Sequence, residues 1–197
     1  MTKRPHVCGG SIISTFKAIP LMSTLSMSLK HWAYPILLLL GVLSVHSVTQ
    51  AADLSGQKAP ACQLESLKEG KAQVLPLRPG HVTYVDFWAS WCGPCRQSFP
   101  FMNKLHKELA SKGLDVIGIN LDEKAEDAQG FLAETPGHFT LLKDQGGACA
   151  TQFDVKAMPS TYLIDQSGTV RLVHLGFKAG ESQDIRKHVE DLLKKLP

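Results

Sequence analysis

Two apolar runs separated by an amphipathic stretch lie at the centre of this 197-residue chain. The first run, 82–87, is rich in β-branched and aromatic residues, which predicts a buried strand. The second run, 115–121, has the same character and is reached through a turn at Gly113. Between the runs, apolar residues recur at the three- and four-residue spacing of one helix face: Phe99, Met102, Leu105 and Leu109. This order of strand, helix and strand predicts a βαβ unit with two parallel strands.

The same patterning predicts smaller elements on both sides of this unit. Residues 57–77 mix short apolar runs with turn residues, as a hairpin does. The elements expected after the unit are a polar helix over 124–135, a strand over 139–142, a short helix over 148–153, strands over 161–164 and 169–175, and a closing helix from about 182. We therefore expect an α/β domain over 52–197, with a central mixed β-sheet flanked by helices.

The first 51 residues follow a different pattern. Residues 1–26 have no periodicity and no acidic side chain, so we expect disorder there. From Met27, an alternative start, Lys30 precedes an apolar run over 36–45, and a small-residue cleavage site ends at Ala51. These are the parts of a signal peptide, and the apolar run is short for a membrane span. We expect cleaved export to the periplasm, with an uncleaved membrane anchor as the alternative.

The charge distribution narrows the possible partners. The formal net charge of +3 comes from the first part of the chain, where four of the 21 basic residues precede Asp53 and no acidic residue does. The remainder carries 17 basic and 18 acidic residues, so it is close to neutral. We expect no nucleic-acid-binding surface on such a domain.

A Cys-x-x-Cys pair stands where the first strand meets the amphipathic helix. Free N–H groups and the positive end of the helix dipole stabilise a thiolate at a helix N-terminus. We therefore expect Cys92 to be the exposed nucleophile and Cys95, one turn later, to be the resolving thiol. The alternatives are a structural disulfide and half of a zinc site, but no second Cys/His pair stands at ligand spacing. We expect no metal and no cofactor other than a redox-active disulfide.

Two segments of the chain resemble known oxidoreductases. Asp86-Phe87-Trp88-Ala89, followed by Trp91-Cys92-Gly93-Pro94-Cys95, is similar to the active site of thioredoxin. The later segment 158–165 resembles the cis-proline strand of the extracytoplasmic TlpA- or ResA-like reductases. The similarity runs from about Gly56 to the C-terminus. It implies a thioredoxin-like fold with an N-terminal β-hairpin, and it identifies 124–135 as the central insertion of that group.

The resemblance assigns a catalytic role to an acidic residue within the first strand. Asp86 matches the buried aspartate of thioredoxin, so it would be the base that helps to deprotonate Cys95. Many TlpA/ResA-like proteins carry asparagine there, and a polar residue without a catalytic part is the alternative. Thioredoxin also has a lysine near this aspartate, whereas this chain has Gly118 at about that place. The catalytic residues expected are Cys92, Cys95 and Asp86.

The resemblance also implies where a substrate binds. Pro159 would be cis, and the backbone of Met158 before it would then pair with a substrate strand. Trp91 would lie on the exposed rim of the site. The substrate-binding residues expected are Trp91, Gly93, Pro94, Met158 and Pro159.

Two further cysteines are required by no thioredoxin-type mechanism. Removal of the N-terminal segment leaves four cysteines, an even number that suits an oxidising compartment. If Cys92 pairs with Cys95, the remaining pair is Cys62–Cys149. Two inert thiols in the core are the alternative. A structural disulfide between Cys62 and Cys149 is therefore a hypothesis.

Together these features predict an exported thiol–disulfide oxidoreductase. The Gly93-Pro94 pair is that of the reducing thioredoxins, so we expect reduction of protein disulfides. By resemblance, the substrates would belong to cytochrome c or copper-site maturation, and a membrane thiol-reductant donor of the DsbD/CcdA type would supply electrons to a monomer. The alternatives are a disulfide oxidant or isomerase on the same fold, and a copper(I)-binding chaperone that uses the Cys pair.

Overall fold

A computed structural model of the chain describes residues 54–195. The expectations for the extension and the signal peptide lie outside the described residues, as do positions 52, 53, 196 and 197. Within the described part of the chain, no helix has both the length and the apolar character to cross a membrane.

The domain is built on a seven-stranded mixed sheet with the order β2-β1-β5-β4-β3-β6-β7. The strands are β1 (Gln63–Ser66), β2 (Ala72–Val74), β3 (Val82–Trp88), β4 (Leu114–Asn120), β5 (Thr140–Lys143), β6 (Ser160–Ile164) and β7 (Val170–Leu175). The central strands β3, β4 and β5 run parallel, and the other pairings are antiparallel. The predicted α/β class, mixed sheet and N-terminal hairpin are therefore confirmed.

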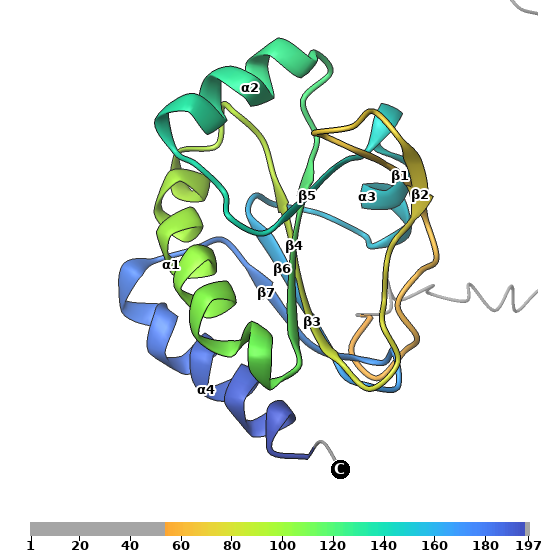
Figure 1. Ribbon diagram of the computed structural model, residues 1–197, viewed down its shortest axis with the longest axis vertical. Helices are drawn as coiled ribbons and strands as arrows, with labels where there is room; N and C mark the ends of the chain where they lie inside the picture. The colour runs from red at the N-terminus through yellow and green to blue at the C-terminus, as the bar shows by residue number, and fades with distance from the viewer. Residues whose placement is uncertain (1–53, 196–197) are drawn as a thin grey trace, which may run out of the picture. The chain divides into compact units, whose positions relative to one another are not determined.

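Helices cover both faces of this sheet. They are α1 (Gly93–Leu109), α2 (Ala125–Glu134), α3 (Ala148–Gln152) and α4 (Ser182–Leu193), with short 3-10 turns at Ala110–Lys112, Gln145–Gly147 and Ala179–Glu181. Figure 1 shows α1 and α4 together on one side of the sheet, and α3 on the other side, next to the β1–β2 hairpin that forms one edge of the sheet. The polar helix predicted over 124–135 is α2, and it packs Phe131 against Trp88 and Phe99 of the α1 face.

Alternation along β3 separates two hydrophobic cores. Tyr84 and Trp88 enter the core that α1, α2 and α4 cover, which also contains the active-site cysteines. Val85 and Phe87 enter the opposite core beneath α3 and β1. Successive side chains of a strand point to opposite faces. Asp86 therefore lies on the α1 face, the same side of the sheet as Cys95.

Candidate active site

The redox pair lies where β3 is followed by α1. Cys92 is the N-cap of α1, and a disulfide joins it to Cys95 with the Cα atoms 5.3 Å apart. The backbone N–H of Cys95 donates to Cys92 Sγ over 3.2 Å. The first turn of this fully described helix contains no acidic side chain. The partial positive charge of the helix N-terminus therefore acts on Cys92 Sγ without a local acid to oppose it.

The expected exposure of Cys92 is wrong for this state of the protein. Cys92 is only 4% exposed, and Cys95 is fully buried. The bond to Cys95, together with the hydrogen bond from its N–H, holds Sγ of Cys92 against the first turn of the helix. The two cysteines still differ, because Cys92 borders a surface groove and Cys95 is not among its lining residues.

This groove is the hollow beside the disulfide and has a volume of about 510 Å³. One wall is the segment 91–94, which includes Trp91, 71% exposed. The other wall is formed by Leu121, Ala150 and the segment 155–158. The structure thus gathers most of the predicted substrate-binding residues: Trp91, Gly93, Pro94 and Met158. Pro159 is not part of the lining, although its peptide bond with Met158 is cis.

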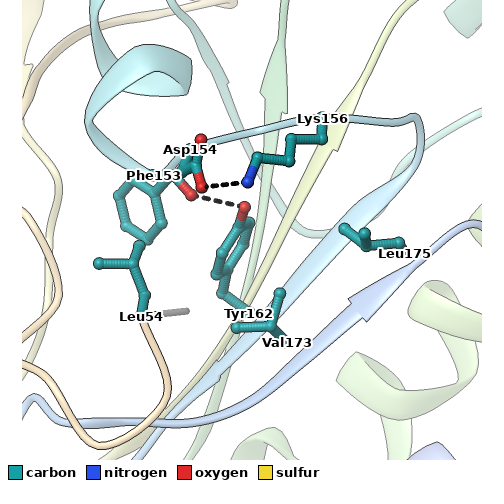
Figure 2. Close-up of a pocket in the computed structure, with 7 residues that line it drawn as sticks. All are labelled: Leu54, Phe153, Asp154, Lys156, Tyr162, Val173 and Leu175. Carbon is teal, nitrogen blue, oxygen red and sulfur yellow. Dashed lines mark hydrogen bonds and ion pairs between the residues drawn. The ribbon is translucent and has the colours of Figure 1, made fainter. Parts of the chain in front are cut away.

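A second hollow, of about 240 Å³, is lined by Phe153, Asp154 and Lys156, where the chain enters the wall at 155–158 (Figure 2). Lys156 lines both hollows and pairs with Asp154 over 2.8 Å. Below this pair, the hydroxyl of Tyr162 donates to the carbonyl of Phe153 over 2.7 Å. The buried Tyr162 on β6 therefore fixes the backbone two residues before the groove wall begins at Val155.

On the face of the sheet that α1 covers, Asp86 takes part in a buried hydrogen-bonded chain. Its Oδ1 accepts from Thr161 Oγ1 over 2.6 Å, and Thr161 Oγ1 lies 3.1 Å from the hydroxyl of Tyr84. Asp86 is fully buried, and its Oδ2 has no hydrogen-bond partner among the described residues. Burial raises the pKa of Asp86 to about 7, against the opposing effect of the Thr161 hydrogen bond. The carboxyl group can therefore bind and release a proton near neutral pH.

Gly118 occupies the position beside Asp86 on β4, as the sequence predicts. A Cβ atom at Gly118 would lie 3.0 Å from the ring of Phe139 and 3.2 Å from side-chain atoms of Leu141 and Trp88. Real Cβ atoms are rarely this close to other heavy atoms, so aromatic and aliphatic side chains fill the space in which a longer residue would stand. The strand next to β3 therefore brings no cation to Asp86.

A second polar network holds the turn that precedes Cys92. The carboxylate of Asp122 accepts from the backbone N–H of Ser90 over 2.9 Å and from its hydroxyl over 2.9 Å. The side-chain amide of Asn120 donates to the same carboxylate over 2.7 Å. The sequence alone does not predict this network. Its signal is the short polar segment directly after the second parallel strand, since the carboxyl ends of β3 and β4 meet at one edge.

The other two cysteines within residues 54–195, Cys62 and Cys149, are also bonded to each other. The Cys62–Cys149 disulfide spans 87 residues, its Cα atoms lie 5.2 Å apart, and both residues are buried. It joins the residue before β1 to α3. Asp144 accepts hydrogen bonds from the N–H groups of Cys149 and Ala150, and Ala150 lines the groove. The second disulfide therefore lies one residue from the wall of the active-site groove.

The chain is similar to known redox proteins in both sequence and fold. Residues 54–192 match the family described as Redoxin. The thioredoxin-like protein YneN of Bacillus subtilis is 34% identical over 158 residues, which cover 75% of this chain and 91% of that protein. The thiol:disulfide interchange protein HelX of Rhodobacter capsulatus is 36% identical over 119 residues, covering 59% of this chain and 65%, less than two thirds, of that protein. A crystal structure from Chlorobium tepidum, a candidate thiol:disulfide interchange protein DsbE, is 41% identical with a TM-score of 0.67, covering 71% of this chain and 97% of that one.

Proposed function

The chain belongs to the redoxin family, and we propose that it is an exported thiol–disulfide oxidoreductase that reduces protein disulfides. The observation that carries this proposal is the Cys92–Cys95 disulfide at the N-terminus of α1, where Cys92 alone of the pair borders the groove. A substrate sulfur can approach Cys92 from the groove, and the helix terminus stabilises the thiolate that attacks it.

The exchange takes place in two steps that transfer two electrons. In the reduced protein, the Cys92 thiolate attacks a substrate disulfide, and the released substrate sulfur takes up a proton. Cys95, once deprotonated, then attacks Sγ of Cys92, breaks the mixed disulfide and releases the second substrate thiol. The Cys92–Cys95 disulfide is the product of this second step. A membrane thiol-reductant donor of the DsbD/CcdA type would return the pair to the dithiol.

Asp86 is proposed as the base in the second step. Cys95 is fully buried, so its proton has no direct access to solvent. Asp86 lies on the α1 face of β3 with an unpartnered Oδ2 among the described residues, and its pKa is about 7. A base whose pKa lies near the working pH is efficient in proton transfer. The proton that Asp86 accepts from Cys95 can then pass to the departing substrate thiolate.

The groove favours an extended polypeptide as substrate. The side chains around Cys92 are mostly apolar, and Trp91 presents a large exposed ring at the rim. An unfolded segment that carries a cystine fits this surface better than a small charged disulfide does. A cytochrome c precursor or a copper-site protein before metal insertion would be such a substrate.

Export is supported by two independent features. The pattern of residues 27–51 is that of a signal peptide. The buried Cys62–Cys149 disulfide is of the structural kind found in oxidising compartments. We expect the mature N-terminus at or near Ala52. Mass spectrometry of the periplasmic fraction tests this, and an intact Met1 or Met27 terminus would establish an uncleaved anchor instead.

Trapping experiments test the assignment of the two thiols. Cys95→Ser should accumulate a mixed disulfide with a protein substrate such as insulin, because the second step is blocked. Cys92→Ser should neither reduce insulin nor trap it. The reverse pattern would exchange the two roles.

The direction of the reaction is tested by the reduction potential. A potential nearer to about −270 mV, the value of thioredoxin, supports a reductase, whereas one near about −120 mV, the value of DsbA, would assign an oxidant.

A further inference from the structure

Thr161 lies directly opposite Asp86 in the pairing of β3 with β6. Both side chains are buried on the α1 face, and Thr161 Oγ1 is 2.6 Å from Asp86 Oδ1. An ionised carboxylate can only accept hydrogen bonds, so the hydroxyl of Thr161 must donate to it. The exchange steps described above assign no task to this hydroxyl.

Tyr84 determines the direction of the hydrogen-bonded chain. Because the single proton of Thr161 Oγ1 is directed at Asp86, its lone pairs are available to the Tyr84 hydroxyl 3.1 Å away. Burial, and then the nearby charge of Asp86, raise the pKa of Tyr84 well above its ordinary value. Tyr84 therefore stays protonated at neutral pH, and its hydroxyl donates a hydrogen bond to Thr161 Oγ1.

The other elements packed around Asp86 supply no charged partner. At the position that faces it, β4 carries Gly118, which has no side chain. Among the described residues, the titratable groups nearest in register on this face are Tyr84 on β3 and His174 on β7. His174 lies opposite Thr161 and pairs with Glu181 over 3.2 Å, and the cysteines of α1 are bonded to each other in this state. Burial favours the neutral acid, and the Thr161 hydroxyl is the group that opposes it.

We propose that Thr161 is a positioning residue for the exchange reaction, whose hydroxyl, oriented by Tyr84, holds Asp86 in the ionised form that accepts the proton of Cys95. This inference rests on the role of Asp86 proposed above. The two oxygens of the Asp86 carboxylate then have different roles. Oδ1 is fixed by Thr161, and Oδ2, unpartnered among the described residues, remains free to accept a proton.

Replacement of the hydroxyl tests this directly. Thr161→Val removes the donor while it keeps the branched shape and nearly the same volume. A hydrogen bond to a charged group stabilises that group, so its loss should raise the pKa of Asp86 by about one to two pH units. The carboxyl carbon of Asp86, followed by NMR through a pH titration of the oxidised protein, reports this change. The pH midpoint for release of the mixed disulfide should rise equally, with a roughly tenfold slower release at pH 7.

Three further variants make the test specific. Thr161→Ser restores the hydroxyl and should restore the pKa of Asp86. Thr83→Val removes a buried hydroxyl from the opposite face of β3 and should leave that pKa unchanged. Tyr84→Phe should raise it by less than Thr161→Val does, and it provides the measurement if Thr161→Val does not fold.

The possible failures are distinguishable. An unchanged Asp86 pKa in Thr161→Val, or in Tyr84→Phe if the former does not fold, overturns the inference about Thr161. If that pKa rises but Asp86→Asn releases the mixed disulfide at the wild-type rate and with the wild-type pH profile, the proposed base role of Asp86 fails instead.

Discussion

At the scale of residues, the site contains a buried carboxyl group whose hydrogen-bond partner is an uncharged hydroxyl. This group is Asp86, and a carboxylate inside a protein is costly unless it is hydrogen-bonded or neutralised by a proton. Here a hydroxyl group donates to Asp86 in place of a cationic partner, and burial raises the pKa of Asp86 to about 7. The residue is therefore suited to proton transfer and poorly suited to stabilising the fold.

Asp86→Asn should keep the fold and slow the release of the mixed disulfide. The amide cannot take a proton from Cys95, so general-base assistance, which contributes about 10²–10⁴-fold in enzymes, is lost. The wild-type release rate should rise through pH 7 and then level off, whereas the variant should lack that inflection. Stopped-flow measurement with a preformed mixed disulfide checks this. A matching rate and pH profile would make Asp86 a structural residue.

Asp122 controls the turn before Cys92 by a different mechanism. Asp122→Ala leaves the part-buried donors of Ser90 and the buried amide of Asn120 unpaired, which should cost about 2–4 kcal/mol of unfolding free energy. The attack of Cys92 should also slow, because the turn that places it is loosened. Denaturant unfolding and the rate of mixed-disulfide formation measure the two effects. Asp115→Ala is the matched control on β4, since its ion pair with the exposed Arg78 should contribute less. Equal losses in the two variants would contradict a special role for Asp122.

At the scale of elements, α3 and the wall that follows it depend on a covalent connection. The five-residue α3 is too short to be stable alone, and it is held by Asp144 at its start and by Cys149 within it. Its backbone leads through Ala150 to the groove wall. An element of this size can line the groove only because other elements fix it.

The double variant Cys62→Ala/Cys149→Ala should lose stability and substrate affinity together. In the chain-entropy model, a link across 87 residues stabilises the fold by about 4–5 kcal/mol. Because Ala150 adjoins Cys149, KM for a protein disulfide should rise, while the reaction with a small aromatic disulfide should continue at the wild-type rate. Urea unfolding and steady-state kinetics provide the two measurements.

Thiol counting in the wild-type protein gives an independent check. Under mild reductant the mature protein, which lacks Cys8 of the N-terminal segment, should expose two thiols per chain, from Cys92 and Cys95. Four would show that the buried disulfide is reduced as readily as the active-site one, which would contradict its structural role.

Elements with a strong local pattern could be predicted from the sequence, and contacts set by strand register could not. The strand predicted at 82–87 and the apolar face predicted from Phe99 to Leu109 correspond to β3 and α1, because burial imposes a two- or 3.6-residue period on the chain. The contact of Asp86 with Thr161 spans 75 positions and exists only in one antiparallel register of β3 and β6. No local pattern encodes such a register.

The burial of Cys92 cannot be predicted from the sequence for a similar reason. A helix N-terminus indicates reactivity, but how much of the sulfur meets solvent depends on the disulfide and on the rim around it. The Cys62–Cys149 pairing could be formulated as a hypothesis by counting cysteines. Its position beside the groove required the fold.

For the whole molecule, two carboxyl groups give stability an opposite dependence on pH. The pKa of Asp86 is raised in the folded state from 3.8 to about 7, so its ionisation destabilises the fold as pH rises from about 4 to 7. Burial favours the neutral form of Asp165, but hydrogen bonds from Ser167, Arg171 and Thr169 outweigh it and lower its pKa to about 2. Its contribution is present above about pH 4 and is lost as pH falls towards 2.

The oxidised protein should therefore be most stable near pH 4–5 with respect to these two groups. Asp86→Asn should remove the decline between pH 4 and 7, which amounts to at most about 4 kcal/mol. Asp165→Asn should remove the loss of stability below pH 4 and leave the decline above it unchanged. Chemical denaturation across this pH range measures both slopes. A wild-type stability that stays level from pH 4 to 7 would contradict the raised pKa of Asp86.

The state of the buried Cys62–Cys149 pair also depends on the compartment in which the domain folds. Its sulfur atoms are enclosed by the core beneath α3, so an oxidant reaches them only while that core is still open. A chain that completes folding in a reducing compartment keeps both thiols, and later transfer to an oxidising one closes the bond only after partial unfolding. Two batches of identical sequence can thus differ lastingly in one covalent bond. Their stability and substrate affinity would then be determined by the history of the chain as well as by its composition.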